Sequence, residues 1–175
     1  MPPAAQDPAA LPLGTPGPMV PVEGDGEAGK AAAALLAQAR REVLVLVDPP
    51  LAAAFDLEAA DAVADLVARR PPRPLRLLVT DAADGFRALP RMVELARRFG
   101  SFIKLRALAP EEAPPRECYL LFDAAAVVHQ PDREECRFRV HTRALALARR
   151  LQADFEGRWP HAAPLPGVHT LGLGR

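Results

Sequence analysis

The chain has 175 residues, half of them hydrophobic, and its 22 basic side chains balance its 22 acidic ones. This length and apolar content predict one domain with a substantial core. A formal charge of zero argues against a nucleic-acid partner, which usually requires a strong basic excess. No apolar stretch approaches the ~18 residues that a membrane span needs, so we expect no membrane insertion.

Both ends of the chain differ in composition from its centre. Residues 1–26 hold seven of the 20 prolines, which predicts an extended, poorly ordered segment without the pattern of a signal peptide. Residues 160–175 are expected to form a flexible tail, which leaves 27–159 as the folded domain. Two cysteines, Cys118 and Cys136, are too few for a disulfide framework, and they favour a bacterial-type cytoplasmic protein with reduced thiols.

Helical and strand patterns alternate through the first part of the domain. The segments VLVLV and LRLLV are continuous apolar runs, as expected for buried strands, whereas FIKLRAL alternates like a half-exposed strand. Between them, apolar residues recur at helical spacing. The expected order is helix, strand, helix, strand, helix, strand, over residues 27–41, 43–47, 57–70, 75–79, 86–96 and 102–108.

The second part of the domain predicts a hairpin, a short strand and a closing helix. Strands at 118–122 and 125–129 are joined by a short link, and a third strand follows at 136–140. In the last helix an apolar stripe is expected to pack beside Phe138 and Val140, and it consists of Leu147, Leu151, Phe155 and Trp159. The fold class expected is α/β, with a mixed, mainly parallel sheet flanked by helices.

One glycine-rich motif, Gly24 to Ala31, matches both G-x-x-x-x-G-K and G-x-G-x-x-G. Such motifs bind phosphate at the start of a helix, after a strand. Pro21 interrupts the residues before the motif, and Asp25 and Glu27 would repel phosphate. We therefore interpret this stretch as a lead-in to a helix.

Two acidic residues, Asp48 and Asp81, follow the first and second strands. Ligands of open α/β sheets bind beyond the carboxyl ends of the strands, so these residues are candidate ligands of a divalent cation. Aspartate is also common in turns and at helix N-caps, and both positions fit that structural role.

Two further groups of side chains suggest chemistry. A Cys118–His129 pair across the hairpin could form a nucleophile, although a cysteine in an apolar strand is more often an inert core residue. If two cationic strand faces adjoin, they would bind an anion. These faces carry Lys104, Arg106, Arg137 and Arg139.

The stretch from Arg116 to Trp159, RECYLLFDAAAVVHQ followed by TRALALARRLQADFEGRW, resembles the C-terminal part of a phospholipase D-like domain. In that superfamily an H-x-K-x-x-x-x-D motif occupies a strand-turn-strand hairpin, followed by a strand and a helix. The resemblance implies a phospholipase D-like half-domain over 27–159. Laid on this hairpin, the His, Lys and Asp positions fall on Arg116, Cys118 and Asp123, so that Asp123 alone matches.

These departures predict a degenerate member without catalytic residues, similar to uncharacterised bacterial domains of this type. In active members His attacks phosphorus and Lys stabilises the oxyanions, whereas arginine is permanently protonated and cannot attack. The first interpretation is a binding or regulatory module of unknown ligand that needs no cofactor. The alternatives are a metal-dependent phosphoesterase-type enzyme that uses Asp48 and Asp81, and a structural homodimer.

Overall fold

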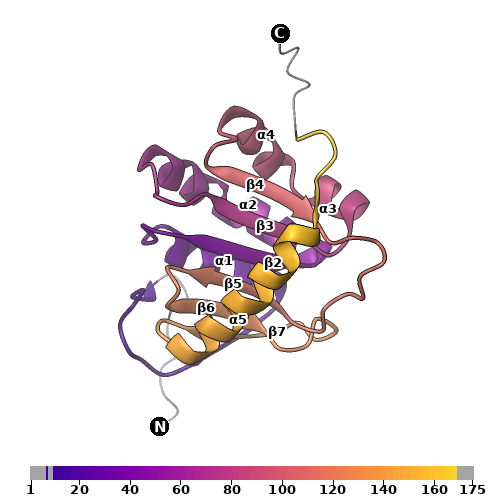
Figure 1. Cartoon of the computed structure of the whole chain (residues 1–175). Coiled ribbons are helices and arrows are strands. Elements are labelled where there is room, and N and C mark those ends of the chain that lie inside the picture. Colours follow the sequence, from indigo (N-terminus) through magenta and orange to yellow (C-terminus); the bar gives the residue numbers. More distant parts are fainter. Residues whose placement is uncertain (1–6, 8–9, 169–175) are drawn as a thin grey trace.

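The computed structural model describes residue 7 and residues 10–168, which build a sheet with the strand order β1-β7-β6-β5-β2-β3-β4-β8 (Figure 1). The strands are β1 (Val20–Glu23), β2 (Val43–Val47), β3 (Leu75–Val79), β4 (Ile103–Ala107), β5 (Cys118–Phe122), β6 (Ala126–Gln130), β7 (Arg137–His141) and β8 (Ala163–Pro164). The helices are α1 (Asp25–Leu36), α2 (Pro49–Ala68), α3 (Ala82–Ala88), α4 (Pro90–Arg98), α5 (Leu145–Arg158) and the short 3-10 helix η2 (Trp159–His161).

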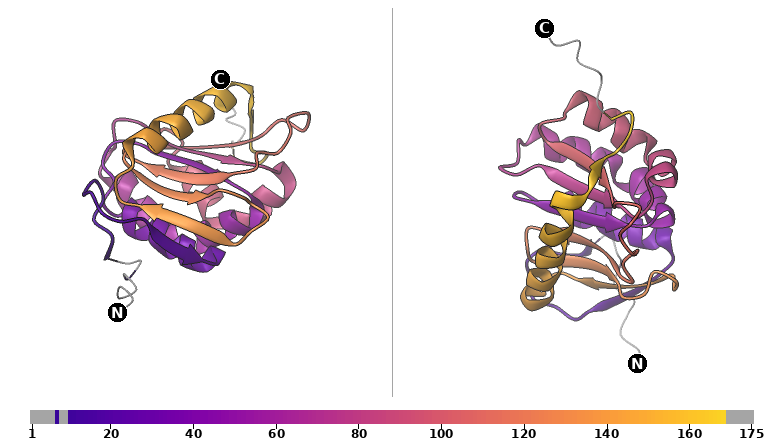
Figure 2. Two further views of the ribbon diagram at one scale, coloured as in Figure 1. Left: turned by 90° about the horizontal axis from the view of Figure 1, so that it is seen from below. Right: turned by 45° about the vertical axis from the view of Figure 1, so that its right-hand side comes forward.

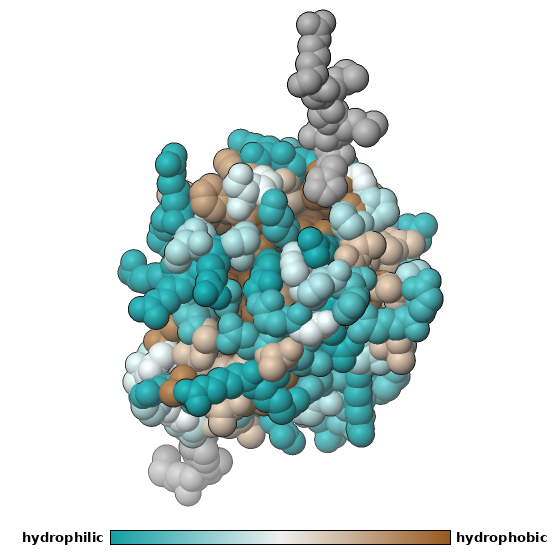
Figure 3. All heavy atoms as spheres, viewed as in Figure 1, coloured by the Kyte–Doolittle hydropathy of each residue, from teal (hydrophilic) through white to brown (hydrophobic). Residues whose placement is uncertain are grey.

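Helices cover the sheet unequally on its two faces. The helices α1 to α4 pack on one face, and α5 crosses the other face alone (Figure 2). Every residue of β2 is buried, which explains the continuous apolar run of its sequence. On the face that carries α5, hydrophilic side chains predominate at the surface (Figure 3).

The sheet is mixed, as the sequence predicts, but fewer of its strand pairs are parallel than expected. Parallel pairing joins β2 to β3 and β3 to β4. The other five pairs are antiparallel, among them β2 with β5 and the β5–β6 hairpin. The expected mixed sheet is confirmed, but it is mainly antiparallel, because β5, β6 and β7 extend it beyond β2 in antiparallel order and β1 and β8 add antiparallel strands at the two edges.

Local signals set two helix boundaries that the apolar periodicity missed. Asp48 caps α2, since its carboxylate accepts a hydrogen bond from the Leu51 N–H at 3.2 Å, and Pro49 and Pro50 suit the first helical turn. The helix consequently begins eight residues before the expected start at residue 57. The helix expected over 86–96 is divided by Pro90, which begins α4.

The structure corrects the expected limits of the folded domain at both ends. Val20–Glu23 form β1, paired with β7, and Leu11 is buried in the core. Near the other end Ala163–Pro164 form β8, and Leu165 is buried. The proline content of these segments is compatible with edge strands, where a missing N–H costs no ladder hydrogen bond. Residues 1–6, 8–9 and 169–175 lie outside the described part of the chain.

The closing helix α5 packs on different strands from those expected. Leu151 and Phe155 belong to the apolar cluster that includes Leu46 and Tyr119, at the centre of the sheet. Phe138 and Val140 point to the opposite face, toward α1 to α4. The prediction that α5 packs beside these two residues is thus wrong, because side chains alternate between faces along β7.

The glycine-rich motif at Gly24 does follow a strand, contrary to expectation. However, α1 begins at Asp25, so the motif residues are helical and form no loop around a phosphate. Gly29 lies where α1 and α2 pack closely, and a Cβ there would be 2.8 Å from the Ala54 carbonyl oxygen. Lys30 forms an ion pair with Glu27 at 3.1 Å. Gly29 therefore serves the packing of α1 on α2.

Candidate ligand site at the carboxyl ends of β2 and β3

The position that carries lysine in the hairpin motif is occupied by Cys118, the first residue of β5. Its side chain is fully buried among the residues that face α1 to α4. Burial, with a smaller effect of the nearby Asp48 charge, raises the pKa of the Cys118 thiol to about 12. A thiol with this pKa stays protonated at neutral pH, so it is a poor nucleophile and carries no charge.

The position that carries histidine is occupied by Arg116, in the loop before β5. Its side chain is 82% exposed, and its guanidinium forms an ion pair with Asp132 at 3.1 Å. Arginine stays protonated and offers no lone pair for attack on phosphorus. Arg116 and Cys118 therefore supply neither the nucleophile nor the buried cation of the motif.

The retained residue, Asp123, lies at the far end of β5 from Cys118. Its carboxylate accepts hydrogen bonds from the backbone N–H groups of Arg40, Arg41 and Glu42, at 2.9, 2.8 and 3.0 Å. Its backbone has a φ of 52°, in the left-handed region that aspartate tolerates. Asp123 thus ties the hairpin turn to the segment between α1 and β2, which is a structural role.

The structure brings Asp48 and Asp81 together, as their positions after β2 and β3 predict. Both line a cavity of about 410 Å³, and Thr80, Arg133 and Glu134 also line it. Both carboxylates cap helices, because Asp81 accepts from the Asp84 N–H at 2.8 Å just as Asp48 accepts from Leu51. Burial raises the pKa of Asp48, and the opposing effects of its backbone hydrogen bond and the Arg133 charge are smaller.

The donor set of this cavity suits a metal ion poorly. Across the residues that the structure describes, no three His, Cys, Asp or Glu side chains lie close enough together to hold one. The Arg133 guanidinium shares the cavity with the two aspartates and partly balances their charge. Three acidic side chains and one basic side chain thus line the cavity, namely Asp48, Asp81, Glu134 and Arg133.

The two cationic strand faces expected to adjoin are far apart. Lys104 and Arg106 lie on β4, whereas Arg137 and Arg139 lie on β7, and four strands separate these two in the sheet. Arg106 is fixed by its hydrogen bond to the Trp159 carbonyl oxygen at 2.9 Å. The four cations therefore form no joint anion site.

An ion-pair network that was not predicted from the sequence lies on the α5 face. Glu117 contacts His129 at 2.7 Å and Arg150 of α5 at 2.7 Å. His129 points to this face, whereas Cys118 points to the other, so the suggested Cys–His pair does not form. No local motif signals the network, because α5 supplies Arg150 from a distant part of the chain.

The arrangement of sheet, hairpin and closing helix is that of phospholipase D-like proteins. Nuc from Salmonella typhimurium, a phospholipase D family member, matches with a TM-score of 0.58 and 13% identity over 84% of this chain and 98% of its own. NucT from Helicobacter pylori matches with a TM-score of 0.55 and 7% identity over 84% of this chain and 99% of its own. The chain therefore has a phospholipase D-like fold, as the sequence resemblance implies.

Within that fold, the chain belongs to the family described as Domain of unknown function (DUF7931), whose model matches residues 25–171. TrmBL2, an archaeal chromatin protein that binds DNA, has a TM-score of 0.61 at 18% identity over 83% of this chain. The chain spans about half of TrmBL2, 54% of its length. No curated protein matches the chain in sequence. None of the described helices combines the length and apolar character of a membrane span.

Proposed function

We propose that this domain is a non-catalytic member of the phospholipase D-like superfamily that acts as a binding or regulatory module. The observation that carries the proposal is the pair of side chains at the motif positions. Arg116 is an exposed, ion-paired cation and Cys118 is a buried, protonated thiol. A covalent phospho-enzyme needs a nucleophile with a cation beside it, whereas Arg116 cannot act as the nucleophile and Cys118 carries no positive charge.

The cavity at the ends of β2 and β3 supports a binding role with altered ligand chemistry. Three carboxylates, Asp48, Asp81 and Glu134, line it together with one guanidinium, that of Arg133. This excess of negative charge repels a phosphodiester and favours a ligand that carries an amine or another cation. The module would then keep the scaffold of the superfamily while binding a different class of molecule.

Activity assays on the full chain test the proposal directly. Purified protein is incubated with phosphatidylcholine, an activated phosphodiester and single-stranded DNA, with and without Mg²⁺ or Mn²⁺. We expect no turnover above buffer. Turnover that Arg116→Ala or Asp48→Asn abolishes, and that the exposed control Arg143→Ala preserves, would overturn the proposal.

One observation favours a metal-dependent enzyme as the second candidate, namely that Asp48 and Asp81 line the same cavity. A ligand that binds the native state alone raises the melting temperature. This candidate therefore predicts stabilisation by Mg²⁺ or Mn²⁺ that Asp48→Asn or Asp81→Asn removes, whereas Asp84→Asn, at an exposed acid of α3, preserves it. An unchanged melting temperature with either ion contradicts this candidate.

A further inference from the structure

A second cavity, of about 270 Å³, lies at the opposite edge of the molecule from β1, where strand pairing is incomplete. The two-residue strand β8 covers Arg106 and Ala107 of β4, and in the described part of the chain no other strand pairs with this edge of β4. The C-terminal part of α4 and the segment 164–168 close the remaining sides. Incomplete pairing thus leaves a hollow between a strand edge and two covering segments.

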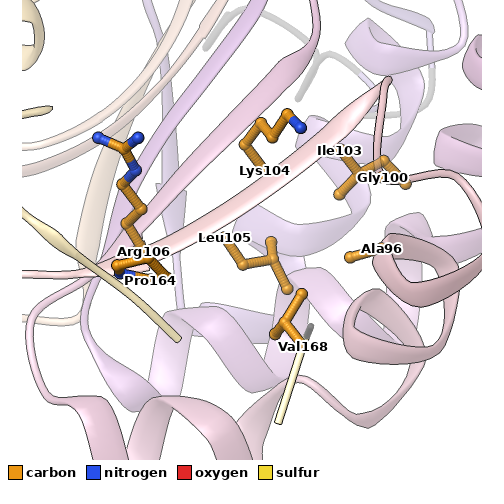
Figure 4. A pocket seen from close by; sticks show the side chains of 8 residues that line it. All are labelled: Ala96, Gly100, Ile103, Lys104, Leu105, Arg106, Pro164 and Val168. Atoms are coloured by element: carbon orange, nitrogen blue, oxygen red, sulfur yellow. The ribbon is translucent and has the colours of Figure 1, made fainter. Parts of the chain in front are cut away.

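The cavity has an apolar interior and a cationic rim. Figure 4 shows Lys104 and Arg106 projecting from one side of β4, and Leu105 from the other side toward Ala96 and Val168. The apolar residues are nearly fully buried, with Leu105 4% and Ala96 3% exposed. A ligand seated here would place its apolar part against these side chains and its polar head at the rim.

The charge of the rim determines whether the ligand is expected to be an anion or a cation. None of the described residues that line the cavity is acidic. The Arg106 guanidinium lies 4.2 Å from the centre of the Trp159 ring and is held by the Trp159 carbonyl, which orients it before any ligand binds. Among the described residues, none forms an ion pair or hydrogen bond with the Lys104 side chain. Two cations without a counter-charge favour an anionic head.

We infer that this cavity binds a small amphipathic anion, a carboxylate or phosphate head on a short hydrocarbon tail. Its volume is below the usual range of ~300–1,000 Å³ for ligand sites, which limits the tail to a few carbons. Lys104 supplies a flexible charge, and Arg106 supplies fixed donors at the other end of the rim. The site is separate from the cavity at Asp48 and Asp81, so it can bind its ligand whether or not the first site is occupied.

The full chain is titrated with hexanoate and with hexyl phosphate, and binding is followed by isothermal calorimetry. We expect saturable binding of at least one of them, and the tighter ligand identifies the head group. Lys104→Gln should weaken the affinity for this ligand by about tenfold or more, because a charge-assisted hydrogen bond is lost. Lys30→Gln is the matched control, at the only other lysine of the sequence, and should change nothing.

Two further measurements distinguish binding in this cavity from non-specific binding to the protein surface. Hexan-1-ol, which keeps the tail, and acetate, which keeps the head, should each bind at least about tenfold more weakly than hexanoate. The ligand should also slow acetylation of Lys104 relative to Lys30, measured by mass spectrometry. The inference is overturned if neither anion binds, if hexan-1-ol binds as tightly, or if Lys104→Gln leaves the affinity unchanged.

Discussion

The Glu117 carboxylate contacts the His129 imidazole at 2.7 Å, beside the start of the β5–β6 hairpin. Arg150 of α5 holds the other oxygen of the same carboxylate at 2.7 Å. The hydrogen bond from Arg150 lowers the pKa of Glu117 most, burial opposes this shift, and the bond with His129 lowers the pKa further. One carboxylate thus joins the hairpin to the closing helix.

Glu117→Gln should make the protein less stable in a pH-dependent manner. Because the folded pKa of Glu117 lies below its ordinary value of 4.5, its contribution is complete above that pH. The contribution is lost as the pH falls through the folded pKa. Urea unfolding from pH 7 to pH 3 should show that the difference from the wild type narrows below pH 4.5. The exposed Glu111→Gln is the control, and a difference independent of pH contradicts the prediction.

The two cysteines should differ sharply in reactivity. Both are free, with Cys118 buried and Cys136 exposed. Iodoacetamide at pH 8 should modify Cys136 in the native protein, whereas Cys118 should react after unfolding in urea, because its thiol is protonated and inaccessible. Mass spectrometry of peptides measures both rates. Equal labelling of the two residues in the native protein would show that β5 opens readily.

Asp123→Ala should destabilise the fold by about 2–4 kcal/mol, because three backbone N–H groups lose their acceptor. Asp123→Asn retains one side-chain oxygen as an acceptor and should lower the free energy of unfolding by less than Asp123→Ala does. The control is Ala124→Gly, which alters the next residue of the turn, at a φ of 53°, without touching the carboxylate. Chemical denaturation measures the differences. Equal stability of Asp123→Ala and the wild type would remove the structural role of this carboxylate.

Phe155→Ala should cost about 3–5 kcal/mol of unfolding free energy, because a fully buried ring is removed from the α5 interface. The ring also stacks on Trp159 with centroids 5.6 Å apart. Leu145→Ala, at a residue that is 41% exposed on the same helix, should change stability by less than about 0.5–1 kcal/mol. A Phe155→Ala variant that melts at the wild-type temperature would show that α5 contributes little.

A structural homodimer has a simple signature in solution. If the chain forms a structural homodimer, the second alternative drawn from its sequence, light scattering after size exclusion will give twice the chain mass of 18.8 kDa. A mass of one chain at high concentration excludes this interpretation.

Long uniform patterns made most of the fold predictable from the sequence. VLVLV and LRLLV occupy β2 and β3 over the expected residues, the first hairpin strand is correct at 118–122, and the second begins and ends one residue later than expected. The edge strands were missed because β1 and β8 are short and contain proline, and their pairing depends on partners far along the chain. Side-chain alternation explains the wrong packing partners of α5, because one strand faces two different layers.

The candidate site was predictable only where it follows directly from strand order. Asp48 and Asp81 meet because parallel neighbouring strands end at the same edge of the sheet. The prediction of a joint cationic site was wrong, because it required β4 and β7 to be neighbours in the sheet. Lys104 and Arg106 lie on β4, and Arg137 and Arg139 lie on β7. Arg133 in the cavity and the Glu117 network depend on tertiary contacts that no sequence spacing reveals.

Strand β1 pairs with β7, so that Val20 lies opposite Val140. During synthesis on the ribosome, β1 emerges long before its partner exists. Its apolar residues, Val20 and Val22, are therefore exposed to other nascent chains during that interval. Pro21 lacks an N–H and limits such pairing, as proline does on edge strands. Nascent chains that end before residue 137 consequently lack the strand that pairs with β1 in the folded protein.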